Sequence, residues 1–299
     1  MQISVVLPSY NSEGSLRLVL EQLQRQDFAG EFEVIVCDCS NHDLVEQICH
    51  EFAMVKYVRE AERFNPGIGR NLGAKHASGQ LLLFLDTDVL LQENALTNAW
   101  DYYLHGNRVF GGALELDRHK KPTAASYLEH WFFNHESQKG RPCCARNNLS
   151  SALMAIDRLL FLNSCGFRDI PRMQDTEFTE RLKASGQRLT YTPRVVGYQI
   201  QDSPLSKVLT KIYINGVNLF FIRYNKMATV KKALFFLSLP LLSLFKTVRI
   251  IIRHLKYQDE RGRIITIIWM PLLFLGGLYW MLGLYRSMIF GGEISARRD

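Results

Sequence analysis

The chain has 299 residues, 47% of them hydrophobic, and a formal net charge of +7. This length accommodates one large domain or two, and the apolar share supports a substantial core. Many basic residues lie after Lys207 beside long apolar runs, a pattern that favours an anionic membrane surface as partner. No nucleic-acid-binding motif is present, so we expect no nucleic acid partner. The six cysteines lack C-x-x-C spacing, which predicts reduced thiols in a cytosolic compartment.

The N-terminal region alternates between short apolar runs and amphipathic segments. Strands are expected at 3–7, 32–37 and 55–58, with helices beginning near Ser12 and covering 42–52. Further strands are expected at 81–85, 109–114 and 151–156. This order predicts an α/β fold, a Rossmann-like doubly wound and mostly parallel sheet with helices on both faces.

Carboxylates stand at the ends of two of these strands. Asp86 and Asp88 follow the buried run 81–85, and Asp38 follows the second strand. Ligands of open parallel sheets bind at the carboxyl ends of the strands. Paired carboxylates there suit a hard cation such as Mg²⁺ or Mn²⁺ together with substrate phosphates, although Asp-x-Asp is also common in turns. Asp38 suits a hydrogen bond to a nucleoside, or alternatively a helix cap or turn.

A glycine-containing segment, 65–73, precedes the Asp86 strand. Its glycines predict a tight loop that enters a helix, and Arg70 within it can pair with phosphate oxygens. The segment lacks the Gly-Lys-Ser/Thr ending of ATPase phosphate loops. Residues 134–148 show no apolar periodicity, which indicates a long polar loop of the kind that often forms a lid.

Asp175 opens a predicted helix whose Phe178 and Leu182 share one face. The helix dipole stabilises a carboxylate at this end, so Asp175 suits either a general base or a plain helix cap. Glu177 and Arg181 are four residues apart and are predicted to pair.

The ordered motifs resemble the family 2 glycosyltransferases of GT-A fold. The resemblance covers roughly residues 3–196 and rests on LPSYNSEGSL, VIVCDCSNHD, NPGIGRNLGAKHASGQLLLFLDTDV, CGF and QDTEFTERLKASG. It implies inverting transfer of a sugar from a nucleotide-sugar, usually a UDP-sugar, with Mg²⁺ or Mn²⁺ as cofactor. The acceptor hydroxyl would lose its proton to a base and attack the anomeric carbon opposite the diphosphate.

The same resemblance assigns roles to individual residues. It places a set of side chains and loop residues around the nucleotide: Pro8, Tyr10, Asn11, Asp38, Arg70 and Asp86. It also implies that Asp86 and Asp88 hold the metal and that Asp175 is the catalytic base.

Three positions depart from the family pattern. Gln174 replaces the first of two adjacent acids in the base motif, and Cys37-Asp38-Cys39-Ser40 lacks one acid and the glycine of the usual run. Gln199 stands where many members have a histidine, which affects the third contact to metal or diphosphate. The Gln-x-x-Arg-Trp sequence of processive synthases is absent, so we expect one addition per cycle.

The C-terminal third has a different composition. The apolar run 233–245 is short and contains Pro240, whereas the uncharged run 264–285 is long enough to span a membrane. Basic residues recur at helical spacing between them, which indicates an amphipathic helix in the membrane interface: Lys246, Arg249, Arg253 and Lys256. A two-span hairpin and a buried hairpin of a soluble protein are alternatives.

These features predict a catalytic domain at 1–204 and a membrane-associated helical region at 205–299. The latter would hold interfacial helices at about 207–256 and a transmembrane helix at 264–285. Nucleotide-sugars are made in the cytosol, so the catalytic domain is expected to face the cytoplasm. A membrane location predicts a lipid or lipid-linked acceptor. Alternatives are a polyprenyl-phosphate sugar synthase, a nucleotidyltransferase and a non-catalytic membrane-bound protein that binds nucleotide-sugars.

Overall fold

A computed structural model describes residues 1–117, 121–170, 172–224 and 227–291. The chain divides into two compact units. Unit 1 comprises 1–117, 141–169 and 174–200, and unit 2 comprises the remaining described residues. The helix α5 (Ala124–Asn134) lies within the predicted 1–204 region, yet it packs with the C-terminal helices in unit 2.

Unit 1 is built on a mixed sheet of nine strands among its described residues, in the order β3-β2-β1-β4-β8-β6-β9-β5, with β7 paired to β9. The strands are β1 (Ile3–Ser9), β2 (Phe32–Asp38), β3 (Val55–Arg59), β4 (Leu81–Leu85), β5 (Val89–Leu91), β6 (Val109–Leu116), β7 (Cys144–Ala145), β8 (Leu153–Asp157) and β9 (Thr190–Gln199). The pairs among β1 to β4 are parallel, whereas β8 lies antiparallel to both β4 and β6.

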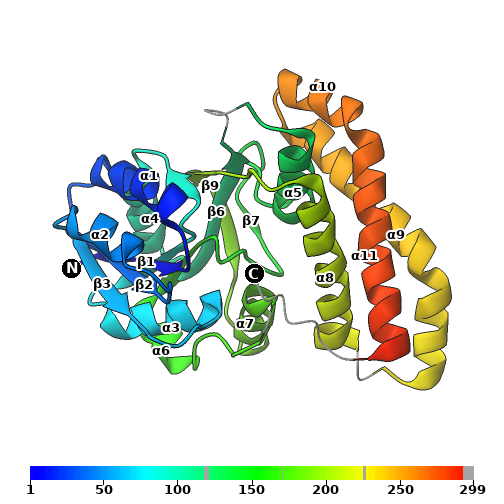
Figure 1. Cartoon of the computed structure of the whole chain (residues 1–299), viewed down its shortest axis with the longest axis horizontal. Helices are drawn as coiled ribbons and strands as arrows, with labels where there is room; N and C mark the ends of the chain where they lie inside the picture. Colours follow the sequence, from blue (N-terminus) through cyan, green and yellow to red (C-terminus); the bar gives the residue numbers. More distant parts are fainter. Residues whose placement is uncertain (118–120, 171, 225–226, 292–299) are drawn as a thin grey trace. The chain divides into compact units, whose positions relative to one another are not determined.

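Helices cover both faces of this sheet (Figure 1). They are α1 (Glu13–Gln24), α2 (Leu44–His50), α3 (Pro66–His76), α4 (Ala95–Leu104), α6 (Arg158–Asn163) and α7 (Gln174–Ala184). Side chains alternate along a strand, so Val5 packs with α1, α2 and α4 while Val6 packs with α3, α6 and α7. The predicted α/β fold with a doubly wound sheet is therefore confirmed.

The predicted glycine loop at 65–73 is wrong, because α3 already begins at Pro66. The Asn65 side chain accepts a hydrogen bond from the Ile68 amide, and Pro66 suits the first helical position. Gly73 is needed where the helix crosses β1, since a Cβ there would lie 2.3 Å from the Val6 side chain. Arg70 thus projects from a helix that is packed tightly on the sheet.

The expected loop at 134–148 is partly ordered on the sheet. Within it the short strand β7 pairs antiparallel with β9, Cys144 opposite Tyr191. This portion is fixed by backbone hydrogen bonds. A role as a lid stays a prediction.

Unit 2 contains α5 and four C-terminal helices: α8 (Leu205–Tyr224), α9 (Thr229–Tyr257), α10 (Glu260–Ile268) and α11 (Met270–Phe290). Their apolar residues form one core that includes Trp131, Ile212, Leu239 and Leu273. The prediction of a single helix at 264–285 is wrong, because the helix is interrupted at Trp269, between the end of α10 and the start of α11. Pro271 in the first turn of α11 disfavours a continuous helix there.

Pro240 does not interrupt the helix as the sequence suggested, since α9 runs through it. Proline lacks the amide that would bond the carbonyl four residues before it, here that of Phe236. The Tyr285 hydroxyl donates to this carbonyl at 3.1 Å, and the rings of Phe236 and Tyr285 lie 4.5 Å apart. A tertiary hydrogen bond thus replaces the missing helical one.

Three basic residues of α9, Lys246, Arg249 and Arg253, contact other parts of unit 2. Arg253 and Arg249 pair with Glu136 at 2.6 and 3.5 Å. The Lys246 ammonium lies 4.1 Å from the centre of the Trp280 ring. Most of the exposed side chains of α9 between Val230 and Ile252 are apolar, which is the reverse of a water-soluble helix.

Candidate functional site

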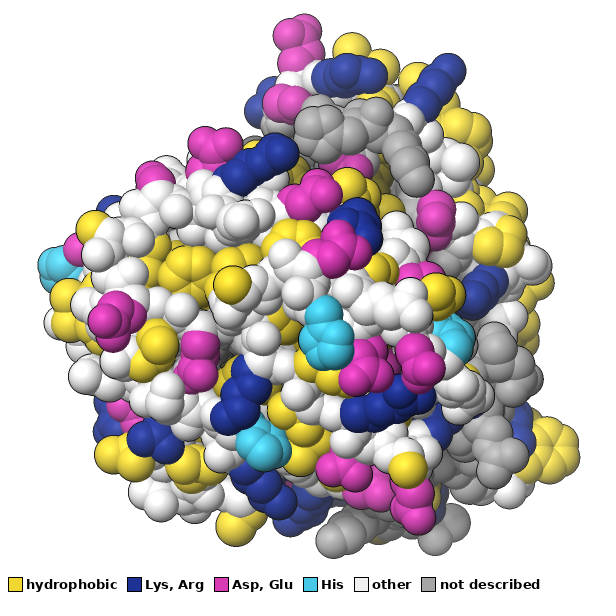
Figure 2. Space-filling view, turned by 60° about the vertical axis from the view of Figure 1, so that its left-hand side comes forward, with side chains coloured by type: hydrophobic (Ala, Val, Ile, Leu, Met, Phe, Trp, Pro, Cys, Tyr) yellow, Lys and Arg dark blue, Asp and Glu magenta, His cyan; other side chains and the backbone are white. Residues whose placement is uncertain are grey.

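Three neighbouring parallel strands bring the predicted site residues to one edge of the unit 1 sheet. β1 lies between β2 and β4, with Ser9 opposite Asp38 in the register. Tyr10, Asp38 and Asp86 therefore follow adjacent strand ends, where open sheets bind ligands. On the face of the molecule in Figure 2, acidic and basic side chains are interspersed.

Asp38 is fully buried and accepts hydrogen bonds from three hydroxyls. Ser9 and Ser40 donate at 2.8 and 2.7 Å to one carboxylate oxygen, and Tyr57 donates at 3.0 Å to the other. Burial and the Asp38 carboxylate raise the pKa of Tyr57, so the phenol keeps its proton. Asp38 thus holds the loops after β1 and β2 together, and its contact with a nucleobase stays a prediction.

Those loops present Tyr10 and Asn11. Asn11 has a positive φ of 48°, and its amide donates to Ser40 Oγ at 2.8 Å. The Arg63 guanidinium lies 4.2 Å from the centre of the Tyr10 ring, a cation–π contact that the sequence did not indicate. Pro8 is buried within β1 opposite Cys37, so it shapes the strand end.

Arg70 reaches from α3 to Asp86 and forms an ion pair with it. Arg70 is only 3% exposed, and its guanidinium carbon Cζ lies 5.7 Å from the centre of the Phe167 ring. Its Nε is buried without a hydrogen-bond partner among the described residues. A buried guanidinium with an unused donor suits an additional anion, such as a phosphate oxygen.

Asp88 lies beside Gln199. β5 and β9 pair antiparallel with Val89 opposite Gln199, so the preceding Asp88 faces the end of β9. The Gln199 amide donates to the two Asp88 oxygens at 3.3 and 3.4 Å. The structure therefore places Gln199, which stands where many family members have a histidine, next to the predicted metal ligand Asp88.

The donor set fits a divalent cation that arrives with substrate. Among the described residues, no group of three or more His, Cys, Asp or Glu side chains could hold a metal by itself. Mg²⁺ usually binds through one or two carboxylates plus substrate phosphates. Asp86 and Asp88 supply such carboxylates, and rotation of the Gln199 amide would add a carbonyl oxygen.

Asp175 lies at the start of α7, near the same strand end. β8 pairs with β4, and the Asp86 amide donates to the Ala152 carbonyl at 3.2 Å. The neighbouring Ser151 backbone and the Thr176 amide hydrogen-bond to Asp175, the latter at 2.7 Å. Burial raises the pKa of Asp175, opposed in part by these bonds and by the Arg70 charge.

Sequence reasoning did not identify several residues that shape this site. The partners of Asp38 come from the end of β1, the loop after β2 and the middle of β3, and Arg63, from the loop before α3, contacts the Tyr10 ring. The predicted Glu177–Arg181 ion pair is confirmed, at 3.1 Å. None of the other contacts has a periodicity or spacing that would reveal it.

Solved structures with a similar fold include two glycosyltransferases with bound nucleotide-sugars. The mannosyltransferase PcManGT from Pyrobaculum calidifontis, in complex with GDP-Man and Mn²⁺, has a TM-score of 0.62 and 16% identity. The similarity covers 96% of this chain and 87% of that one. S. aureus TarS 1–349 in complex with UDP-GlcNAc has a TM-score of 0.52 and 17% identity, covering 96% and 92%. These similarities confirm the GT-A fold.

Relatives in sequence match only part of the chain. The poly(ribitol-phosphate) beta-N-acetylglucosaminyltransferase TarS of Staphylococcus aureus is 35% identical over 104 residues, 33% of this chain and 18% of that protein. The validoxylamine A glucosyltransferase of Streptomyces hygroscopicus subsp. limoneus is 40% identical over 93 residues, 29% and 20% of the two chains. The matches thus span about a fifth of these relatives' own length.

The family comparison covers a larger part of the chain. The profile described as "Glycosyl transferase family 2" matches residues 4–161, more than half of the sequence. This range contains the strand ends with Asp38, Asp86 and Asp88. The chain therefore belongs to glycosyl transferase family 2.

Proposed function

We propose that the protein is an inverting glycosyltransferase that moves a sugar from a UDP-sugar to an acceptor hydroxyl, one addition per cycle. The observation that carries the proposal is the convergence of a buried cation, Arg70, a strand-end carboxylate, Asp86, and a carboxyl with a raised pKa, Asp175. Such a set can bind a diphosphate on one side and accept a proton on the other. The UDP-GlcNAc bound by TarS supports a UDP-sugar as donor.

Each residue has a defined task in this reaction. Pro8 at the end of β1 and the loop with Tyr10 and Asn11, which Asp38 helps to hold, contact the nucleotide, and Arg70 binds the diphosphate. Asp175 takes the proton from the acceptor hydroxyl as its oxygen attacks the anomeric carbon. The bond to the diphosphate breaks on the opposite face of the sugar. A Mg²⁺ or Mn²⁺ ion held by Asp86 and Asp88 would offset negative charge on the leaving diphosphate.

The acceptor is proposed to carry a hydroxyl on a lipid or a lipid-linked glycan. A base is useful for a hydroxyl, whose proton must leave, and much less so for a phosphate that is already ionised. Asp175 has a raised pKa and hydrogen bonds that fix its position, both of which suit such a base. The name of TarS refers to poly(ribitol-phosphate), which supports a polymeric acceptor with hydroxyl groups.

Unit 2 is proposed to attach the protein to a membrane. α9 and α11 are long and apolar enough to cross one by length and composition, and most residues in each apolar window are not buried. Exposed apolar side chains recur every three or four residues along α9: Val230, Leu234, Leu237, Leu241, Phe245, Val248 and Ile252. This stripe is about 33 Å long at 1.5 Å per residue, close to the hydrocarbon thickness of a bilayer.

The packing inside unit 2 also resembles that of membrane helices. A Cβ on Gly216 of α8 would lie 2.1 Å from the Trp280 carbonyl, and one on Gly283 of α11 equally close to that of Tyr213. The Ser243 hydroxyl donates to the Gly277 carbonyl at 2.7 Å. Small residues and interhelical hydrogen bonds replace the hydrophobic effect as the main attraction between helices in lipid.

We propose a catalytic domain at 1–204 and a membrane region at 205–299, with the catalytic domain facing the cytoplasm because the donor is made there. The packing of α5 with α8 and α11 adds part of the first range to the helical region.

The test is a transfer screen with the full chain in detergent, using UDP- and GDP-sugars, Mg²⁺ or Mn²⁺, and a total lipid extract. We expect release of UDP that requires both metal and lipid and falls at least 100-fold in Asp88→Ala. Asp101→Asn is the matched control, because Asp101 is an exposed carboxylate on α4 paired with Arg194. Nucleotide binding without release under every condition would contradict the proposal and favour a non-catalytic nucleotide-sugar binding protein.

The screen also separates the two acceptor classes. A polyprenyl-phosphate acceptor needs little help from a base, so Asp175→Asn would keep most of its activity. Loss of transfer in Asp175→Asn with retained UDP binding supports an acceptor hydroxyl instead.

A further inference from the structure

A strained turn connects α6 to the segment before α7 in unit 1. Cys165 and Gly166 have φ values of 61° and 58°, so two consecutive residues adopt the left-handed conformation. This conformation is unfavourable for a residue with a side chain such as Cys165. The turn persists only where surrounding contacts determine it, and two polar side chains make those contacts.

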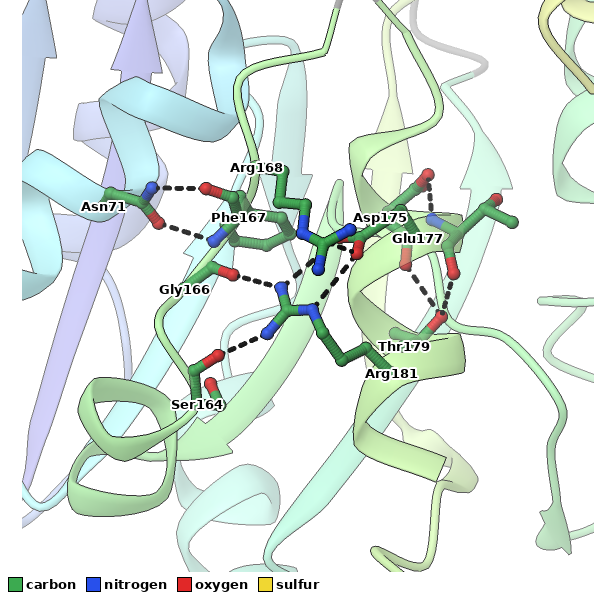
Figure 3. A network of polar contacts seen from close by, with 10 residues as sticks. Asn71, Ser164, Gly166, Phe167, Arg168, Asp175, Glu177, Thr179 and Arg181 are labelled. Atoms are coloured by element: carbon green, nitrogen blue, oxygen red, sulfur yellow. Dashed lines mark hydrogen bonds and ion pairs between the residues drawn. The ribbon is translucent and has the colours of Figure 1, made fainter. Parts of the chain in front are cut away.

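The first is Arg181 of α7, whose guanidinium donates to the carbonyls of Ser164 and Gly166 on either side of Cys165 (Figure 3). Its Nε donates to Glu177 Oε1 at 3.1 Å, and Glu177 also pairs with Arg168 at 3.2 Å. Arg181 therefore fastens α7 to the turn through directed hydrogen bonds.

The second is Asn71 of α3, which bonds the other end of the turn. Its amide nitrogen donates to the Phe167 carbonyl at 2.7 Å, and its oxygen accepts from the Phe167 amide at 2.8 Å. A Cβ on Gly166 would lie 2.4 Å from Asn71 Oδ1, so the glycine allows this approach. Asn71 follows Arg70 directly in the sequence.

These contacts form a continuous connection from the donor side of the site to the base. It runs from α3, with Arg70 and Asn71, through residues 164–168 to Arg181 on α7, whose first turn carries Asp175. The packing of Phe178 against Phe167, with ring centres 4.5 Å apart, holds α7 on the core. Apolar packing is not directional, whereas the hydrogen bonds of Arg181 and Asn71 fix the position of α7 along its axis.

We propose that Asn71 and Arg181 are positioning residues that hold the base Asp175 at its working distance from the Arg70–Asp86 pair. The inference rests on the proposed function. Both act through other groups, Asn71 through the Phe167 backbone and Arg181 through the turn and α7. A displacement of about 1 Å at a reacting group can lower a rate by about 100-fold.

The test compares Arg181→Gln, Arg181→Lys and Asn71→Ala with the wild-type chain in steady-state transfer assays and in titrations with UDP. We expect kcat to fall about 10- to 100-fold, while the donor KM and the Kd for UDP change less than about twofold. Lysine cannot reach both carbonyls with a planar fork, so Arg181→Lys should behave like Arg181→Gln. The double variant should be less impaired than the product of the two single effects, because both act on one turn.

A second substitution tests the turn itself. Glycine adopts a positive φ without steric penalty, so Cys165→Gly should restore part of the kcat lost in Arg181→Gln. Arg17→Gln is the matched control, since Arg17 on α1 forms an exposed ion pair, at 2.5 Å, with Glu51 at the end of α2. Thermal unfolding identifies the variants that fold.

An unchanged kcat in folded Arg181→Gln and Asn71→Ala would overturn the inference, as would equal losses in kcat and in UDP binding. If the wild-type chain transfers no sugar, the proposed function fails, but the positioning role of Asn71 and Arg181 can still be tested. Hydrogen exchange at the backbone amides of 174–176 provides that test. Faster exchange in Arg181→Gln than in the wild type supports the positioning role, and unchanged exchange overturns it.

Discussion

Asp175 combines a catalytic position with an unfavourable environment for its charge. Its pKa lies above the ordinary value of 3.8, chiefly because the carboxyl is buried. A group with a raised pKa in the folded state binds its proton more tightly than in the unfolded chain. Its ionisation above the unfolded pKa therefore lowers the free energy of unfolding. At neutral pH the folded protein is less stable by this amount, but the ionised carboxyl can act as a base.

Asp175→Asn should accordingly unfold at a higher temperature than the wild type at pH 7. The difference should shrink as the pH falls toward the ordinary Asp pKa of 3.8, because the raised pKa makes the wild-type carboxyl regain its proton before that point. Thermal unfolding at several pH values measures both effects. A less stable Asn variant at pH 7 would show that the charged form is favoured in the folded protein.

Asp38 is a buried carboxylate that accepts hydrogen bonds from three hydroxyls. Tyr57→Phe removes one of them, so part of a buried charge loses its partner. We expect a loss of about 1–3 kcal/mol in the free energy of unfolding, measured by urea denaturation. Tyr102→Phe is the control, because Tyr102 contacts the core through its ring, whose centre lies 5.0 Å from that of Phe110. Equal stability of the two variants would contradict the role of Tyr57.

The sequence predicted single residues better than their partners. Asp86 and Asp88 could be placed because a run of buried leucines must end at a sheet edge. The pairing of Arg70 with Asp86, or of Tyr57 with Asp38, depends on how separate strands align, as does the contact of Asn71 with Phe167. Such contacts have no local signature, so they required the structure.

At the scale of elements, local rules failed where tertiary contacts compensate for them. Pro240 predicts a helix end, but the Tyr285 hydroxyl donates a hydrogen bond to the Phe236 carbonyl, which the proline leaves without a helical partner. The glycines of 65–73 predict a loop, but Asn65 and Pro66 provide a helix start, and close packing on β1 requires a glycine. The alternation of strands and helices was predictable because it follows from hydrophobic periodicity over whole segments.

The compensation at Pro240 gives a prediction for unit 2. Tyr285→Phe leaves the Phe236 carbonyl without its donor and should reduce stability by about 0.5–1.5 kcal/mol. In a Pro240→Ala background the alanine amide can bond that carbonyl, so Tyr285→Phe should have little effect. Thermal unfolding in detergent measures the cycle, with Tyr279→Phe on the same helix as control. Equal effects of Tyr285→Phe in both backgrounds would contradict the compensation.

At the scale of the whole molecule, the exposed stripe of α9 is the main argument for a membrane. Leu237 and Leu241 are 75% and 70% exposed, although the same helix buries Leu239, Ile250 and Ile251 in unit 2. A charge placed in the hydrocarbon region costs about 2.5–3.5 kcal/mol on insertion scales. The double variant Leu237→Glu, Leu241→Glu should therefore lose more than tenfold in partitioning to lipid vesicles.

Sedimentation with vesicles of anionic and neutral lipids measures this partitioning. Leu104→Glu is the control, because Leu104 is 65% exposed at the end of α4 in unit 1. If the double variant and the control bind vesicles equally, the stripe does not contact lipid.

The central claim is that this chain transfers a sugar with Asp175 as the base. The most direct measurement is the turnover number of wild type and Asp175→Asn on one donor and acceptor, with UDP affinity measured in parallel. The account predicts a loss of about 10²–10⁴-fold in kcat with UDP binding retained. Comparable turnover in the two proteins would contradict it and assign the proton transfer to another group or to none.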